Sequence, residues 1–204
     1  MDREEQIIKD LKEYWFKDHK ATLTEYGDIA VLDWRKPGTS NYAVRYVFDG
    51  YRMYIGGDIG EAVFNLTWKA TVESFLDVNI SYFISKMAVG ERTTWDGETA
   101  KQALLDWKKE RFENEEYYFN EKFTKDDFKE LIINLIDTTD KCNSQEEWAW
   151  KYVNGEYGDD IYKFDNDYWE WIYDIGNVVP YHTYGFLIGL QMAAKQLKES
   201  EVEQ

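Results

Sequence analysis

The chain is poor in the residues on which cross-linking and metal binding most often depend. Its 204 residues include one cysteine, two histidines and two prolines. The single Cys142 excludes an intramolecular disulfide and a cysteine-based zinc cluster, and it suits a reducing, cytoplasmic setting. Two histidines and one cysteine also disfavour a transition-metal site. We therefore expect no metal and no cofactor.

Membrane-directing segments are also missing from the pattern. Residues 1–5 are charged and lack the apolar core of a signal peptide. Residues 175–194 carry no formal charge, but Gly176, Asn177 and Pro180 interrupt them, which indicates a loop followed by a buried helix. We expect a cytoplasmic protein that does not associate with membranes.

Basic residues are few relative to acidic ones, with 24 Lys and Arg against 40 Asp and Glu, for a formal net charge of −16. Phosphate backbones and anionic lipids both require Lys and Arg for binding. The balance therefore disfavours direct binding of nucleic acid or membrane. It favours partners with basic protein surfaces.

The first half of the chain changes from a helical to a strand period. Residues 4–18 place apolar side chains at helical spacing. Residues 28–56 then alternate apolar and polar side chains around two turn signals, residues 37–40 and Asp49–Gly50. This predicts a three-stranded antiparallel meander. Residues 61–68 are ambiguous and could form a fourth strand.

From about residue 71 to 198 the pattern is helical. Asp96, Thr124 and Ser144 are each suited to cap a helix, and the last two have Asp127 and Glu147 at capping-box spacing. The expected helices cover 71–89, 96 toward Tyr118, 124 onward, 145–153, 166–174 and 181–198. The fold class is therefore predicted as α+β, a small antiparallel meander packed with a helical majority.

The length fits one domain over residues 1–204. Within it, the pattern divides a β-containing N-terminal lobe, residues 1–95, from an acidic helical C-terminal lobe, residues 96–204.

The negative charge concentrates in one segment. Residues 110–174 hold 19 acidic and 7 basic residues, and the densest part, residues 156–174, has only Lys163 as a base. Aromatic residues interleave with these acids. The candidate partner-binding residues are Glu156, Asp159, Asp160, Asp165, Asp167, Glu170 and Asp174, with Tyr157 and Tyr168.

Two interpretations of this segment compete. The acids could simply form a solvated face over an aromatic core, because charge runs usually serve solubility. Alternatively, the face imitates a nucleic-acid backbone. Duplex DNA carries about one charge per 1.7 Å of axis, so the segment's excess of acids matches roughly six base pairs. Exposed tyrosine and tryptophan would then add contact area.

Motifs for catalysis are weak. Asp165–Asp167 begins like a calcium loop but lacks the later ligands. Gly158–Asp160 could ligate Mg²⁺, but tripeptides this short occur by chance, and a turn is the favoured explanation. The glycines at 56–60 lack the lysine of a phosphate-binding loop. Cys142 and His182 could in principle form a nucleophile–base pair, but no oxyanion motif accompanies them. A glycosidase-like carboxylate pair stays open.

Three segments together resemble a group of small acidic proteins encoded by phages and prophages of Gram-positive bacteria. They are LDWRKPGTS with YAVRYVFDG (32–40 and 42–50), GDIGEA (57–62) and DYWEW (167–171). The resemblance covers most of the chain and implies a phage accessory gene whose product acts in the cytoplasm of a bacterial host cell. It carries no catalytic residues, and it suggests a role against host defences such as CRISPR effectors.

Our leading hypothesis is a non-enzymatic inhibitor that occupies a basic nucleic-acid-binding surface on a host defence nucleoprotein. One alternative is a carboxylate- or Mg²⁺-dependent enzyme acting on a nucleotide or defence signal through Asp159 or Asp58. Another is a structural or regulatory phage protein that self-associates.

Overall fold

The computed structural model describes residues 3–114, 119 and 124–202, and it divides into two compact units. Residues 1–92 and 179–204 form the first unit, and residues 93–178 form the second. The sequence pattern had suggested a boundary near residue 95 with a single helical lobe after it. The contacts instead return residues 179–204 to the first unit.

The first unit contains a six-stranded antiparallel sheet in which every strand pairs with its neighbour in the sequence. The α+β class is thereby confirmed. The strands are β1 (Lys20–Tyr26), β2 (Ile29–Arg35), β3 (Val44–Asp49), β4 (Arg52–Gly57), β5 (Ala62–Asn65) and β6 (Met87–Val89).

The predicted meander corresponds to β2, β3 and β4, and the ambiguous segment supplies β5. Strand β1 was missed because it is a polar edge strand with weak alternation, KATLTEY. Its signal was the turn after it, where Gly27 adopts a φ of 64° between β1 and β2. A glycine at positive φ followed by aspartate is suited to a tight hairpin.

The helix expected over residues 71–89 is wrong in extent. Only a 3₁₀ turn (Glu73–Phe75) and the short helix α2 (Ile80–Ser85) form there. Asn79 begins α2 because its side chain accepts a hydrogen bond from the Tyr82 amide. Met87 and Val89 then pair with β5, which provides hydrogen-bond partners for its otherwise open edge.

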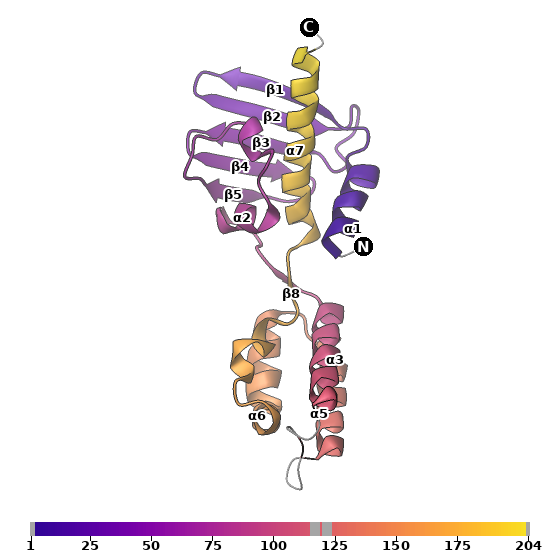
Figure 1. Cartoon of the computed structure of the whole chain (residues 1–204). Coiled ribbons are helices and arrows are strands. Elements are labelled where there is room, and N and C mark those ends of the chain that lie inside the picture. Colours follow the sequence, from indigo (N-terminus) through magenta and orange to yellow (C-terminus); the bar gives the residue numbers. More distant parts are fainter. Residues whose placement is uncertain (1–2, 115–118, 120–123, 203–204) are drawn as a thin grey trace. The chain divides into compact units, whose positions relative to one another are not determined.

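One long helix, α7 (Tyr181–Val202), lies across one face of the sheet (Figure 1). Helix α1 (Arg3–Asp10), which continues as a π-helical turn (Leu11–Trp15), and α2 both pack against α7. The sheet residues on this side are buried, including Leu32, Tyr46 and Phe64. The core of the first unit therefore lies between the sheet and its C-terminal helix.

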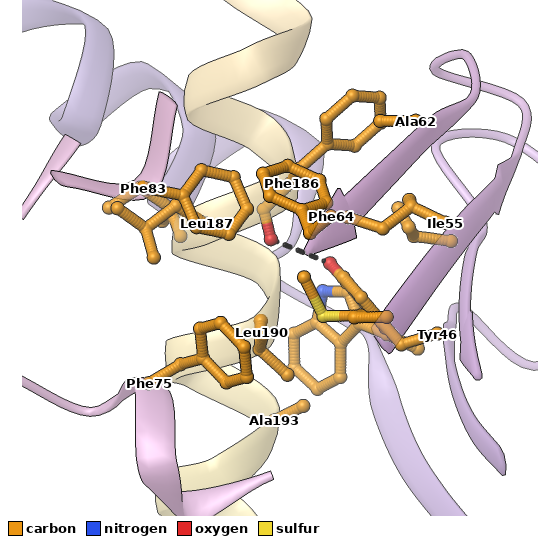
Figure 2. Packing of buried hydrophobic residues seen from close by; sticks show 14 of the residues in the cluster. Tyr46, Ile55, Ala62, Phe64, Phe75, Phe83, Phe186, Leu187, Leu190 and Ala193 are labelled. Atoms are coloured by element: carbon orange, nitrogen blue, oxygen red, sulfur yellow. Dashed lines mark hydrogen bonds between the residues drawn. The ribbon is translucent and has the colours of Figure 1, made fainter. Parts of the chain in front are cut away.

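Tyr46 joins the sheet to the helix inside this core (Figure 2). Its hydroxyl donates a hydrogen bond of 2.9 Å to the Phe186 carbonyl of α7, and its ring is fully buried. Gly189 allows the approach: a Cβ there would lie 2.8 Å from the Tyr46 hydroxyl oxygen and 3.1 Å from Cδ1 of Trp34. The helix can pack this closely because position 189 has no side chain.

We expect Gly189→Ala to destabilise the protein. Alanine favours a helix interior by about 1 kcal/mol over glycine, but the clash with rigid aromatic groups should outweigh this gain and leave a net loss of about 1–3 kcal/mol. Chemical denaturation measures the change. Gly56→Ala is the control, since a Cβ at Gly56 meets no atom within 4 Å. Equal stability of both variants would contradict the close approach.

His19 lies at one corner of the same core and is 3% exposed. Its Nε2 is 3.2 Å from the carbonyl oxygen of Tyr42, whose backbone adopts a left-handed φ of 54°. The Tyr42 amide donates to Asp58 at 2.7 Å, and its ring stacks on Trp15 at 4.4 Å. These contacts hold a backbone conformation that a tyrosine rarely adopts.

Burial lowers the pKa of His19, so the folded state resists its protonation. The unfolded chain binds this proton below a pH of about 6.5. The stabilisation is therefore present above that pH and is lost as the pH falls. We expect the free energy of unfolding to drop between pH 7.5 and 5.5, and to drop less in His19→Gln. An identical pH dependence in the two proteins would contradict the assignment.

The second unit is mainly helical, with a core of its own built on Trp107, Phe128 and Trp148. Its elements are β7 (Thr94–Trp95), α3 (Gly97–Glu113), α5 (Lys125–Thr139), a π-helix η3 (Glu147–Glu156), α6 (Gly158–Phe164), two 3₁₀ turns (Tyr168–Glu170 and Ile172–Asp174) and β8 (Asn177–Val178). Strands β7 and β8 pair with each other.

The predicted caps in this unit are mostly confirmed. Asp96 accepts a hydrogen bond from the Thr99 amide, and Thr124 with Asp127 forms a reciprocal capping box. The Ser144 box is half formed, because the Glu147 carboxylate accepts from the Asn143 amide in place of that of Ser144. Tyr118, the expected end of the helix from Asp96, lies outside the described residues.

Candidate acidic interface

The second unit carries most of the negative charge. Residues 93–178 contain 22 acidic and 10 basic residues, a net of −12, whereas the first unit contains 18 and 14, a net of −4. Residues 115, 116 and 121, which contribute three of these acids, lie outside the described part of the chain. The charge asymmetry of the sequence therefore coincides with a structural division.

Most bases of this unit already have a carboxylate neighbour. Five of the ion pairs join residues three or four apart on one helix. They are Lys101–Glu98, Lys109–Glu113, Lys129–Asp126, Lys151–Glu147 and Lys163–Asp160. Such exposed pairs contribute little to stability, but each base is held beside one acid. The remaining carboxylates gain little neutralisation from them.

Six of the seven predicted acids have exposed side chains, namely Glu156, Asp159, Asp160, Asp167, Glu170 and Asp174. Of these six, only Asp160 has a Lys or Arg nitrogen within 4 Å among the residues that the structure describes. The others face solvent as carboxylates without an ionic partner there. They could therefore meet an external cation without first breaking an internal ion pair.

Asp165 is the exception, because it is part of the interior framework. Its Oδ2 accepts hydrogen bonds from Nη2 of Arg111 at 2.9 Å and from Nε1 of Trp171 at 3.1 Å. Oδ1 accepts from the Asp167 amide at 3.0 Å. The side chains of Arg111 and Asp165 are only 11% and 14% exposed. This carboxylate joins α3 to the segment after α6 and is poorly placed to meet a partner.

Replacing Asp165 with alanine should destabilise the protein by about 3 kcal/mol, since the change leaves a largely buried guanidinium without this carboxylate. Asp167→Ala, two residues away on an exposed side chain, should change the free energy of unfolding by less than about 0.5 kcal/mol. Urea denaturation of both variants measures the difference. Comparable losses in the two variants would show that Asp165 is no more structural than Asp167.

A hollow of about 410 Å³ brings acids of two helices together. Asp160 and Tyr157 line it from one side, and Asp127 and Glu130 of α5 line it from the other. Lys163 also lines it, and its pKa is raised, first by its hydrogen bond to Asp160 and then by the nearby charges of Asp159 and Asp127. The carboxylates around this hollow thus favour positive charge.

The acids of α5 at this hollow were not among the predicted site residues. Their signal was the spacing of Asp127, Glu130 and Asn134, which puts all three on one helix face. The sequence could not show that this face lies beside Asp160, because that contact joins elements 30 residues apart.

The two predicted aromatic contacts are less exposed than expected. Tyr157 and Tyr168 are half-buried, and burial raises the pKa of both hydroxyls. The more exposed aromatic side chains of this unit are Trp150, Tyr162 and Trp169, at 72%, 55% and 49%. These three offer more contact area to a partner than the two chosen from the sequence.

Two of the catalytic alternatives, a metal site and a cysteine nucleophile, depend on groups that the structure describes. Among the described residues, no three His, Cys, Asp or Glu side chains come together as a metal site. Cys142 is buried, and burial raises its thiol pKa to about 11, so at neutral pH it is a weak nucleophile.

Within the described part of the chain, no helix is both long and apolar enough to cross a bilayer.

Comparison with known proteins adds no relative: no family model, curated protein or solved structure matches the chain.

Proposed function

We propose that the protein acts without catalysis, by presenting the acidic face of its second unit to a basic surface that normally binds nucleic acid. The observation that supports this most directly is the availability of Glu156, Asp159, Asp167, Glu170 and Asp174. All five are exposed, and none has an ion pair within the described residues. Their charges are therefore open to an external partner.

The amount of charge fits such a partner. The net −12 of the second unit equals that of about six base pairs of duplex DNA. The acidic hollow between α5 and α6 adds Asp127, Glu130 and Asp160, with Phe164 beside them. Carboxylates next to an aromatic ring suit a lysine or arginine side chain. A basic surface would thus be met by charge, and the hollow would receive one of its basic side chains.

The identity of the partner is proposed from the resemblance to small acidic phage proteins. In that setting the basic surface belongs to a host defence nucleoprotein, such as a CRISPR-type effector. The protein would block the effector by excluding its nucleic acid.

Reversing three exposed acids to lysine, Asp159, Asp160 and Asp167, should abolish capture of the partner from a bacterial lysate. Asp165 is left unchanged because its loss would disturb the fold. Proteins retained by the unmodified chain at about 0.05 M salt should be released at about 0.5 M, where the Debye length falls below about 5 Å. Added duplex DNA or RNA should release them as well.

The matched control reverses three exposed acids of the first unit, Glu25, Glu73 and Asp77. This control variant changes the net charge by the same amount as the test variant. If binding depends on the acids of the second unit, the control should retain the same proteins as the unmodified chain. Capture that survives the Asp159/Asp160/Asp167 reversal, or that resists both salt and nucleic acid, would refute the proposal.

A further inference from the structure

The outward face of the first unit's sheet carries an apolar row across its strands. Register places Val31 of β2 opposite Val47 of β3, Val47 opposite Tyr54 of β4, and Tyr54 opposite Val63 of β5. Val63 pairs in turn with Val89 of β6, which is 64% exposed. These side chains alternate with the buried residues of each strand, so they point away from α7.

No helix of the first unit covers this row in the described residues, since α1, α2 and α7 all pack on the inner face. The four central residues, Val31, Val47, Tyr54 and Val63, are half-buried. Beside them, Gly56 leaves a shallow hollow bordered by Arg45, Val47 and Tyr54. A contiguous apolar surface of this kind is typical of an interaction site.

Charged residues flank the row on both sides, and in β3 a base and an acid lie at equal distances from it. On one side lie Asp33, Arg45 and Gly56 in adjacent strands, and on the other lie Ile29, Asp49 and Arg52. Arg45 also binds Asp33 through two hydrogen bonds of 2.8 and 3.0 Å. With Lys20 and Arg35 at the end of the face, bases outnumber acids here by four to two. This contrasts with the net −16 of the chain.

From this pattern we infer that the outward sheet face binds a second copy of the chain, as a symmetric dimer of two facing sheets. A two-fold axis along the apolar row sets Val47 of each copy against the same row of the other. It also sets Arg45 opposite Asp49 of the second copy, and Arg52 opposite the hollow at Gly56. The same axis sets Asp33 opposite Ile29, where the carboxylate keeps its hydrogen bonds to Arg45 of its own copy. The symmetry thus supplies two Arg45–Asp49 contacts, one from each copy.

The charge of the chain favours a second copy over a basic partner at the outward sheet face. Two copies, each at −16, repel through most of their surfaces, and this repulsion is smaller at a face that has only two acids and where Arg45 of one copy meets Asp49 of the other. A basic partner would instead be drawn to the second unit. The dimer uses a face separate from the acidic interface, so either proposal can fail alone.

The area predicts a weak dimer. Six strands about 4.8 Å apart, with about six residues each at 3.3 Å, cover roughly 500–600 Å². Two copies would bury about 1,000–1,200 Å² in total, which is at the lower limit for a specific interface. Self-association should therefore appear at micromolar concentrations and not at nanomolar ones.

Sedimentation velocity of the full chain tests this between about 1 and 500 µM, at about 0.15 M salt to screen long-range repulsion. We expect the unmodified chain to shift from monomer to dimer with concentration. Val47→Lys places a charge at the centre of the interface and should weaken the dimer at least about tenfold. Val202→Lys makes the same substitution at an exposed helix end and should leave it unchanged.

Exchanging the charges of Arg45 and Asp49 tests the two-fold symmetry of the proposed dimer. Arg45→Asp and Asp49→Arg should each weaken the dimer, and the double variant should restore it, because each acid again faces a base. Circular dichroism confirms that the variants remain folded. A chain that stays monomeric throughout, or a dimer indifferent to Val47→Lys, would overturn the proposal. Failure of the double variant to recover would overturn the two-fold arrangement.

Discussion

The first unit depends on one physical constraint: the large aromatic and aliphatic side chains on the inner face of its antiparallel sheet must be covered. The cover is α7, which lies more than 120 residues beyond the last central strand in the sequence. Its contact with the sheet is close because Gly189 has no side chain where Tyr46 and Trp34 meet the helix. The hydrogen bond from Tyr46 to the Phe186 carbonyl satisfies a hydroxyl that would otherwise be buried without a partner.

Because α7 belongs to the first unit, residues 93–178 are an insertion between the sheet and its own covering helix. The insertion has a separate core around Trp107, Phe128 and Trp148, so its surface composition can vary without affecting the sheet. It holds 22 of the 40 acids in fewer than half of the residues.

The acids differ in what they do, although they look alike in the sequence. Asp165 lies in a network with Arg111 and Trp171, whereas Asp167, two residues later, is exposed. Both stand in the same Asp-Asn-Asp run. Burial alone separates a framework carboxylate from one available to a partner, and burial depends on contacts with α3, more than 50 residues earlier. The same reasoning applies to Asp127 and Glu130, which become relevant only through their position beside Asp160.

The sequence by itself determined the α+β class, the central three strands, the caps at Asp96 and Thr124, and the location of the negative charge. These features follow from local periods, turn residues and composition, which act over a few residues. Only the tertiary structure decided that α7 covers the sheet, that Met87–Val89 forms a strand where a helix was expected, and which acids are exposed. Each of these depends on contacts between distant segments, where burial and open strand edges override local preference.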